Sequence, residues 1–455
     1  MNFLRIIPRN YLIVTFTYGN IKKVFNNSGP WGSESLKVYN YPDKYNVKKS
    51  FDVIVIGGGA AGMMAAITAA SNGADTMILE HKDRVGKKIL STGNGKCNYT
   101  NELQGVTFYR GDDPAFVLPV MEQFGFDETV SFFEKLGIYP KNRNGYYYPA
   151  SEQAASVLDV LRMELIFRHV SVVTECELRN ILEKKNGFLL ETGKGRFSAQ
   201  KIIFATGLLA APKTGSDGSA IPLIKAFGHR FSDIVPALTA LQCRESFFRQ
   251  LAGIRTEAEV SLFIAGENII SERGELQLTD YGISGIPVFQ VSRFATKALK
   301  KKQAVTAQID FLPRLNEQET EQLFEQRFRE YAHGKIADEA MVGLLNHKLS
   351  GVLLKEAHIS LKKPAEEITK KELLQLVKQC KHMEVCVTGS KSFEQAQVCA
   401  GGVHTDEIDP KTMESRLVPN IYFAGEVVDI DGMCGGYNLQ WAWSSGYVAG
   451  RHAAE

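Results

Sequence analysis

Residues 51–80 constrain the fold more than any other part of the chain. Residues 51–56 form a nearly continuous apolar run of the kind found in a buried parallel strand. The run passes into Gly-Gly-Gly-Ala-Ala-Gly at 57–62, which matches G-x-G-x-x-G, and an Ala-rich stretch expected to be helical follows, through Ser71. A second predicted strand, 76–79, ends on Glu80. Strand, glycine turn, helix, strand and acid in this order predict a dinucleotide-binding α/β unit.

Each glycine of the turn has its own physical role. Gly57 permits the tight turn, Gly59 lets the backbone approach a pyrophosphate, and Gly62 lets the helix pack closely on the strand. The free N–H groups and the positive dipole end of the helix attract phosphate. Glu80 follows the first glycine by 23 residues, where a carboxylate accepts a hydrogen bond from a ribose hydroxyl. An acid there favours an unphosphorylated ribose, and therefore FAD or NAD over NADP.

Later segments favour FAD. The loop 84–98, rich in Gly, Asn and Lys, offers the backbone donors that a ribityl chain needs. Residues 201–207 form a buried strand ending in Ala-Thr-Gly, and residues 420–426 form another ending in Gly-Glu, with Asp429 just beyond. Residues 435–442 open a last helix, whose N-terminus would face the flavin pyrimidine edge. The predicted cofactor-binding residues are Gly57, Gly59, Ala60, Ala61, Gly62, Glu80, Lys88, Thr92, Gly93, Asn94, Gly95, Asn98, Leu178, Ala205, Thr206, Gly207, Gly425, Glu426, Asp429, Gly435, Gly436, Tyr437 and Asn438.

Composition and charge limit the partners. Of 455 residues, 53 are Lys or Arg and 51 are Asp or Glu, a net charge of +2, which supplies no global attraction for nucleic acid. We therefore expect a small-molecule substrate and no nucleic-acid partner. Seven scattered cysteines without Cys-x-x-Cys predict reduced thiols and a cytoplasmic protein, with no metal site. The apolar stretch 11–18 is far shorter than the about 20 residues that a membrane helix needs.

Over residues 51–455 the chain resembles the two-dinucleotide-binding-domain flavoproteins, and among them the aminoacetone-oxidase and BaiN-like family. The motifs that carry the resemblance are GKKILSTGNGKCNYTN (86–101), ATG (205–207), GELQLTDYGISG (274–285), AGGVHTDEI (400–408), TMESR (412–416) and AGEVVDIDGMCGGYNLQWAWSSG (424–446). The resemblance implies an FAD enzyme, closest in character to the branch that reduces unsaturated 3-oxo bile acids. Leu208 departs from the pattern, because a further glycine is common there.

The flavin motifs fall at both ends of the chain, which predicts a discontinuous domain. We expect an α/β fold: a Rossmann-type FAD-binding domain with an inserted small β-barrel and a helical cap domain. The predicted segments are a disordered N-terminal extension at 1–50, the first segment of the FAD-binding domain at 51–237, the barrel insert at 238–315, the helical insert at 316–384, and a return to the barrel edge and the second segment of the FAD-binding domain at 385–455.

No single catalytic acid stands out. Tyr437 could protonate an enolate or simply stack as a wall of the pocket. His404 could be the proton donor, because histidine is the side-chain type suited to acid–base catalysis at neutral pH, although a structural hydrogen bond is the favoured interpretation. Cys97 lies in the predicted flavin loop, although packing is the favoured interpretation there. The aromatic run 146–148 could line a pocket for a flat apolar substrate, and an ordinary strand with one buried face is slightly favoured.

We expect an FAD-dependent oxidoreductase that reduces an activated C=C bond of a 3-oxo-4-ene, bile-acid- or steroid-like substrate, by hydride transfer from the reduced flavin. Only one G-x-G-x-x-G with its helix is present, so NADH or NADPH would bind transiently as the donor. The alternative is an FAD-dependent oxidase of a small aminoacetone-like amine that produces hydrogen peroxide. A third possibility, an RNA-associated flavoprotein, is disfavoured by the near-zero net charge.

Overall fold

The computed structural model describes residues 4–7, 11–14, 16–18, 21–24, 37–39 and 49–455. The chain divides into two units, 1–49 and 50–455. In the first unit, two small antiparallel sheets contain β1 (Leu4–Ile7), β2 (Tyr11–Val14), β3 (Phe16–Tyr18), β4 (Ile21–Val24) and β5 (Lys37–Tyr39). Most of the predicted disordered extension lies outside the described residues, so the disorder stays a prediction.

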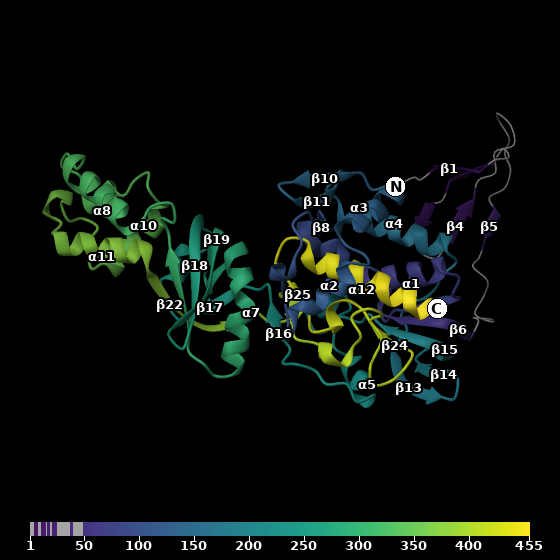
Figure 1. The fold of residues 1–455 in the computed structure, drawn as a ribbon. Coiled ribbons are helices and arrows are strands. Elements are labelled where there is room, and N and C mark those ends of the chain that lie inside the picture. Colours follow the sequence, from purple (N-terminus) through teal and green to yellow (C-terminus); the bar gives the residue numbers. More distant parts are fainter. Residues whose placement is uncertain (1–3, 8–10, 15, 19–20, 25–36, 40–48) are drawn as a thin grey trace. The chain divides into compact units, whose positions relative to one another are not determined.

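A seven-stranded sheet forms the base of the second unit (Figure 1). The strand order is β12-β7-β6-β15-β14-β13, and β24 pairs with the carboxyl end of β15. The parallel strands are β6 (Ser50–Ile56), β7 (Thr76–Leu79), β12 (Ser171–Val173), β15 (Gly195–Phe204) and β24 (Ile421–Phe423). The antiparallel strands are β13 (Leu178–Lys184) and β14 (Gly187–Thr192). Every residue of β7 and β24 is buried, as the apolar runs predict for buried parallel strands.

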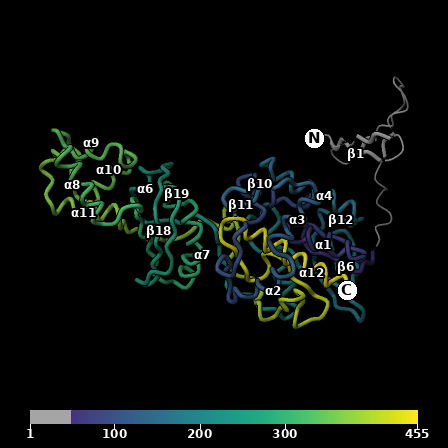
Figure 2. The backbone as a smooth tube through the Cα atoms, turned by 45° about the horizontal axis from the view of Figure 1, so that its top comes forward, coloured from purple at the N-terminus to yellow at the C-terminus, as the bar shows by residue number. Residues whose placement is uncertain are grey.

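The first and last helices of this unit pack directly on each other. Figure 2 shows α1 (Ala60–Ser71) beside α12 (Tyr437–Ala454), purple against yellow. A Cβ on Gly446 would lie 2.5 Å from the carbonyl oxygen of Ala61, and one on Gly450 would lie 2.3 Å from that of Ala65. Glycine at these two positions, four residues apart, is what lets the helix backbones approach so closely.

Further short elements surround the sheet. The ones that bear on the site are η1 (Lys87–Gly95), β8 (Thr100–Asn101), β9 (Tyr109–Arg110), α2 (Leu118–Met121), α3 (Phe126–Lys135), β10 (Pro140–Arg143), β11 (Tyr146–Pro149), α4 (Ala154–Phe167), α5 (Ile221–Ala226), β16 (Val235–Ala237), β23 (Val398–Ala400) and β25 (Asp431–Gly432).

A closed antiparallel barrel interrupts the Rossmann-type domain. Its strands, in order around the barrel, are β17 (Leu241–Cys243), β20 (Gly282–Gly285), β19 (Glu267–Thr279), β18 (Arg255–Ile264), β21 (Val305–Asp310) and β22 (Met383–Ser390). Burial alternates along β21, which is the period expected of a strand with one face in a core. The turn from β18 to β19 uses Ala265 and Gly266, both at positive φ.

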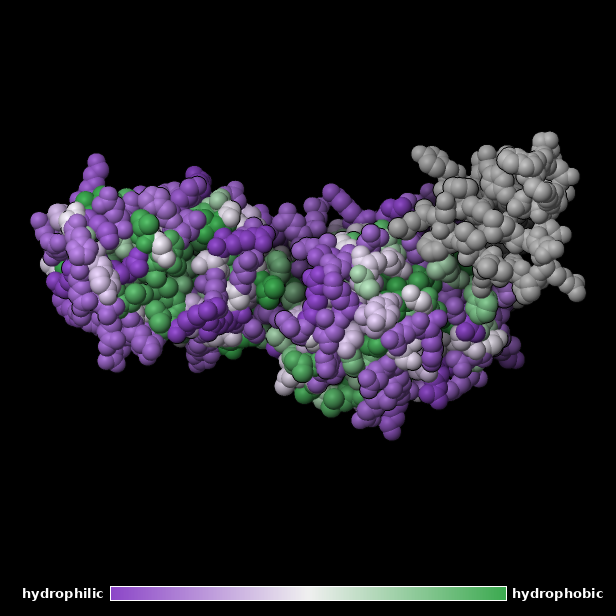
Figure 3. Space-filling view, turned by 90° about the horizontal axis from the view of Figure 1, so that it is seen from above, coloured by the Kyte–Doolittle hydropathy of each residue, from purple (hydrophilic) through white to green (hydrophobic). Residues whose placement is uncertain are grey.

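Helices accompany the barrel. α7 (Ile286–Lys300) follows β20, while α8 (Glu317–Glu325), α9 (Ala337–Ala340), α10 (His347–Glu356) and α11 (Lys370–Lys381) lie between β21 and β22. The helical insert shares its hydrophobic core with the barrel, while the sheet has a core of its own. The predicted fold class is confirmed in its Rossmann-type sheet, barrel and helical insert, and the domain boundaries and the position of the helices as a cap over the flavin stay predictions. The face of the second unit drawn in Figure 3 is mostly hydrophilic, with scattered apolar patches.

Candidate flavin-binding and active site

The turn between β6 and α1 has the geometry of a phosphate cradle. Gly57 has φ +101°, and a Cβ there would lie 2.5 Å from the carbonyl oxygen of Ala205. A Cβ on Gly62 would lie 1.9 Å from the carbonyl oxygen of Gly57. Gly59 differs, because a Cβ there would meet nothing within 4 Å. The α1 N-terminus has no side-chain cap and no acid in its first turn, so the N–H groups of Ala60 and its neighbours face this open space and suit an anion.

Glu80 lies at the carboxyl end of β7, beside this turn. Its carboxylate is buried and accepts hydrogen bonds from the Gly58 N–H (2.8 Å) and the Lys82 N–H (2.7 Å). The segment that precedes Leu178 runs alongside, since the Cys176 N–H donates to the Glu80 carbonyl oxygen at 2.9 Å. Glu80 therefore orients the glycine turn through these bonds. Its carboxylate is also the group predicted to contact the ribose.

The loop after Gly86 adopts an unusual backbone. Gly93, Asn94, Gly95 and Cys97 all have positive φ, between 54° and 81°. Successive left-handed residues turn backbone N–H groups toward one side, which makes a concave surface for anionic or carbonyl oxygens. Thr92 holds the loop shape, because its hydroxyl donates to the Ile89 carbonyl oxygen and its own carbonyl oxygen accepts from the Cys97 N–H.

The C-terminal half of the site comes from the segment after β24. Gly425, at φ +75°, lies so close to α1 that a Cβ would be 2.8 Å from the Cβ of Ala61. The next residue, Glu426, pairs with Lys88 (2.7 Å) and accepts from the Cys399 N–H (2.8 Å). The strand end Ala205–Gly207 lies alongside, because Ala424 N–H donates to the Phe204 carbonyl oxygen and Gly207 faces Glu426.

The Gly435–Gly436 turn starts the last helix. A Cβ on Gly436 would lie 2.8 Å from the backbone of Thr100 and 3.0 Å from Asn98 Oδ1. That Asn98 oxygen is buried and has no hydrogen-bond partner among the described residues. A buried acceptor without a donor is costly, so it marks a place where a ligand N–H belongs. The side chain of Asn438 instead bonds Gly432 at both its N–H and its carbonyl oxygen, so it holds the preceding turn.

The three candidate catalytic residues lie in different surroundings. Tyr437 is buried, stacks on Phe108 with ring centroids 4.7 Å apart, and burial raises its pKa to about 12. Cys97 is fully buried, and burial raises its pKa to about 12, so it is a thiol rather than a reactive thiolate. His404 lies 3.5 Å from the Asp112 carboxylate.

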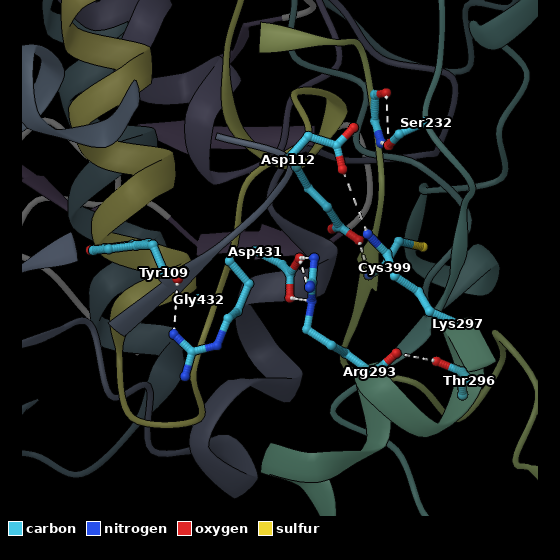
Figure 4. Close-up of polar contacts among 12 residues, drawn as sticks. Tyr109, Asp112, Ser232, Arg293, Thr296, Lys297, Cys399, Asp431 and Gly432 are labelled. Atoms are coloured by element: carbon cyan, nitrogen blue, oxygen red, sulfur yellow. Dashed lines mark hydrogen bonds and ion pairs between the residues drawn. The ribbon is translucent and has the colours of Figure 1, made fainter. Parts of the chain in front are cut away.

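A buried charge cluster connects α7 to the same C-terminal segment, and the sequence did not indicate it. Arg293 pairs with both oxygens of Asp431 at 2.8–3.1 Å, and both side chains are buried (Figure 4). Lys297, one turn further along α7, is directed toward Asp112 at 4.0 Å. Burial raises the pKa of Asp431 to about 6. The signal for this cluster is not local, because Arg293 and Asp431 are 138 residues apart.

Asp429 lies close to this cluster, near Asp112, Lys297 and Arg293. It is fully buried, and neither carboxylate oxygen has a hydrogen-bond partner among the described residues. Burial, and then the nearby Asp112 carboxylate, raise its pKa. A contact from Asp429 to the cofactor stays a prediction.

The open space at Gly59, the carboxylate of Glu80, the left-handed loop and the orphaned oxygen of Asn98 together fit FAD. Fold and site define a flavoprotein with a Rossmann-type FAD-binding domain. The chain belongs to one such family in particular: residues 51–452 match the model of the HI0933-like protein Rossmann domain. The predicted family and the predicted FAD are therefore confirmed, and the chain is an FAD-dependent oxidoreductase.

Known relatives differ in what they act on. The chain is 42% identical over 403 residues to the 3-dehydro-bile acid delta(4,6)-reductase of Clostridium scindens, covering 88% of this chain and 98% of that one. It is 29% identical over 403 residues to the ribosomal RNA dihydrouridine synthase of Haemophilus influenzae, covering 87% and 96%. It is 33% identical to the flavin-containing amine oxidase A of Equus caballus, over only 95 residues, covering 21% and 18%. Among the residues that the structure describes, every helix is too short or too polar to cross a lipid bilayer.

Proposed function

We propose that this protein reduces the C=C bond of a 3-oxo-4-ene bile-acid or steroid-like substrate. The observation that carries the proposal is the 42% identity to a bile-acid delta(4,6)-reductase, which extends over 98% of that enzyme. The candidate site adds support, because it offers an FAD cradle bordered by aromatic side chains.

Reduction of such a bond needs a hydride at the β-carbon and a proton at the α-carbon. FAD, when bound and reduced, supplies the hydride. The residues of the chain orient the enone and handle the proton. Burial keeps the Tyr437 phenol protonated at neutral pH, so its O–H can donate a hydrogen bond to the substrate carbonyl, where negative charge develops. We assign Tyr437 this polarising role.

The electron donor in this proposal is NADH or NADPH, bound transiently at the flavin. The sequence has a single G-x-G-x-x-G followed by the right helix, which supports transient binding of the nicotinamide over binding in a second Rossmann-type domain. A second dinucleotide would therefore use the substrate side of the flavin and leave before the substrate enters. The proposed location is cytoplasmic, supported by the seven free cysteines.

Ribosomal RNA is the competing substrate, because a uracil ring also carries a C=C bond conjugated to a carbonyl group. The electrostatics favour the small molecule. Residues 316–381, the part of the helical insert that ends with α11, hold 11 Lys or Arg residues against 11 Asp or Glu residues, a net charge of zero. RNA binding depends on neutralising phosphates, and a neutral insert on a chain of charge +2 provides little of that attraction.

The test is anaerobic spectroscopy of the FAD-loaded protein. We expect NADH or NADPH to bleach the flavin absorbance, and a 3-oxo-4-ene bile acid to restore it. Uridine-containing ribosomal RNA should not restore it. A flavin that stays oxidised with both nicotinamides and bleaches with aminoacetone would replace the proposal with the amine oxidase alternative. Tyr437→Phe should lower kcat at unchanged FAD occupancy, and an unchanged kcat would remove Tyr437 from the proposal.

A further inference from the structure

The β10–β11 hairpin displays two cations and two tyrosines on one face. Its register pairs Lys141 with Tyr148 and Arg143 with Tyr146. Directly opposite residues of an antiparallel pair project to the same face of the sheet, so these four side chains lie together. Tyr147 projects to the other face and packs edge-on against the buried Tyr99 ring and the half-buried Phe126 ring. The aromatic run is therefore split, with one ring packed against the core and two directed the other way.

The two tyrosines border the predicted flavin loops. Tyr148 Cε1 lies 3.7 Å from where a Cβ on Gly93 would be, and Tyr146 Cε1 lies 3.0 Å from the corresponding point on Gly435. Asn101, on the adjacent strand β8, fixes this arrangement, because its side-chain N–H donates to the Gly435 carbonyl oxygen at 2.9 Å. Tyr146 remains 41% exposed, so its ring is free to contact a ligand.

The region around the two tyrosines carries an excess of positive charge. Glu152 receives Lys96 (3.2 Å), Lys141 and Arg143, so three cations share one carboxylate. These contacts lower the pKa of Glu152 to about 2. Its carboxylate is therefore ionised at neutral pH and contributes one negative charge against the three cations. The cations remain 42–45% exposed and can accept a second anion.

The charge is joined to the aromatic part of the face. The Arg143 guanidinium carbon lies 5.8 Å from the centroid of the Tyr148 ring. Lys96 belongs to the flavin loop itself, between Gly95 and Cys97. Aromatic and cationic side chains therefore lie side by side on a single hairpin.

We propose that this face is the substrate subsite that recognises an amphipathic anion: Tyr146 and Tyr148 hold a flat apolar ring system beside the flavin, and Lys141, Arg143 and Lys96 bind an acidic group at its other end. The inference rests on the proposed function and deepens it. A 3-oxo-4-ene bile acid has its enone at one end and its carboxylate at the other. A neutral 3-oxo-4-ene steroid fills only the aromatic part.

The experiment compares 3-oxochol-4-enoic acid with its methyl ester. Binding to the oxidised, FAD-loaded protein is followed through the perturbation of the flavin spectrum, and turnover is measured separately. The wild type should bind the acid more tightly than the ester, and salt should remove the difference because the cations are exposed. The double variant Lys141→Gln, Arg143→Gln should weaken binding of the acid roughly fivefold, the scale of exposed ion pairs. Its Kd for the ester should not change.

Two further variants locate the ring contact and control for charge. Tyr146→Ala should weaken binding of acid and ester alike, by roughly tenfold, because it removes a shared aromatic surface. Arg179→Gln, which removes an exposed cation from β13, should leave both dissociation constants unchanged.

The outcomes separate the subsite from the proposed function. Equal binding of acid and ester by the wild type, or an equal loss of both in the double variant, would overturn the anionic subsite even if both compounds are reduced. Selective binding of the acid without turnover would support the subsite and defeat the proposed reaction. Loss of ribosomal RNA binding in the double variant, with binding of the acid unchanged, would assign the cations to RNA and overturn the inference.

Discussion

Lys88 and Glu426 lie 338 residues apart in the chain and form an ion pair of 2.7 Å between Nζ and Oε2. The second oxygen of Glu426 accepts from the Cys399 N–H, so the carboxylate is held from two sides. The pair joins the loop that follows the first glycine turn to the strand end that completes the domain. It acts together with the sheet, the α1–α12 contact and bonds such as that from Asn101 to the Gly435 carbonyl oxygen, which also link the two halves of the cofactor site.

The first prediction concerns this pair. Lys88→Met and Glu426→Gln should each lower the free energy of unfolding, and the double variant should show a coupling of about 1 kcal/mol, because the side chains are only partly exposed. Urea unfolding of all four proteins measures it. The neighbouring pair Lys87–Asp83 is a control, with a more exposed carboxylate and no measurable coupling expected. Equal coupling energies in the two pairs would show that partial burial does not strengthen the Lys88–Glu426 ion pair.

The second prediction contrasts two glycines of one motif. Gly59→Ala should leave the Tm of the FAD-free protein unchanged, since a Cβ meets nothing within 4 Å, and it should weaken FAD binding. Gly62→Ala should lower the Tm itself, because its Cβ would lie 1.9 Å from the Gly57 carbonyl oxygen. Thermal unfolding and FAD titration of both variants check this. If Gly59→Ala retains FAD with wild-type affinity, the open space is not the phosphate site.

The third prediction concerns Glu80. Glu80→Ala should weaken FAD retention and also lower the free energy of unfolding by about 2 kcal/mol, because two backbone N–H groups lose their acceptor. Glu80→Gln keeps an amide oxygen that can accept from one of these N–H groups. Its free energy of unfolding should therefore lie between those of the wild type and Glu80→Ala. FAD occupancy after purification and urea unfolding report the two effects separately, with Glu183→Ala on the exposed face of β13 as control. Full occupancy in Glu80→Ala would remove this acid from the ribose contact.

The local motifs predicted the parts of the site that depend on neighbours in sequence. The strand–turn–helix at 51–71, the strand 76–79 that ends on Glu80 and the Gly-Glu after β24 all lie where the pattern placed them. Each is encoded by adjacent residues whose backbone conformation or hydrophobic run is itself the signal.

The rest of the site depends on contacts between distant segments. Arg293 sits on an amphipathic helix, where an arginine normally faces solvent, and only its pairing with Asp431 explains its burial. The sequence around Tyr146 and Tyr148 favours an ordinary strand. The proximity of their rings to Gly93 and Gly435 arises only when three separate segments pack together. No local pattern distinguishes these residues from surface residues of similar type.

The fourth prediction is a pH dependence from Asp431. Its folded-state pKa of about 6 lies above the value of about 3.9 in an unfolded chain, so the folded state binds the proton more tightly. Stability should therefore fall as pH rises from about 4 to about 6, by up to about 3 kcal/mol, and then stay level. Asp431→Asn should remove this dependence. Urea unfolding at pH 4.5 and 7 measures the difference between the two proteins, and a difference that does not change with pH contradicts the assignment.

The fifth prediction concerns the change in the free energy of unfolding when the Arg293–Asp431 pair loses its cation. Arg293→Leu leaves Asp431 buried without its partner and should lower the free energy of unfolding by about 3 to 5 kcal/mol. Arg293→Leu combined with Asp431→Asn should recover part of that loss. Arg255→Leu, which breaks an exposed pair on the barrel, should have little effect. Urea unfolding at pH 7 compares the variants, and no recovery in the double variant would show that Arg293 acts independently of Asp431.

The packing of α12 on α1 has a consequence for how the protein is made. The ribosome delivers the first glycine turn early, and then synthesises a whole barrel and its helices before β24 and α12 emerge. Until then, β15 has an open edge where β24 will pair, and α1 exposes the surface that Gly446 and Gly450 will cover. The barrel can fold meanwhile, since domains fold as units during synthesis. A nascent chain stopped before β24 should therefore hold a finished barrel and be unable to retain FAD.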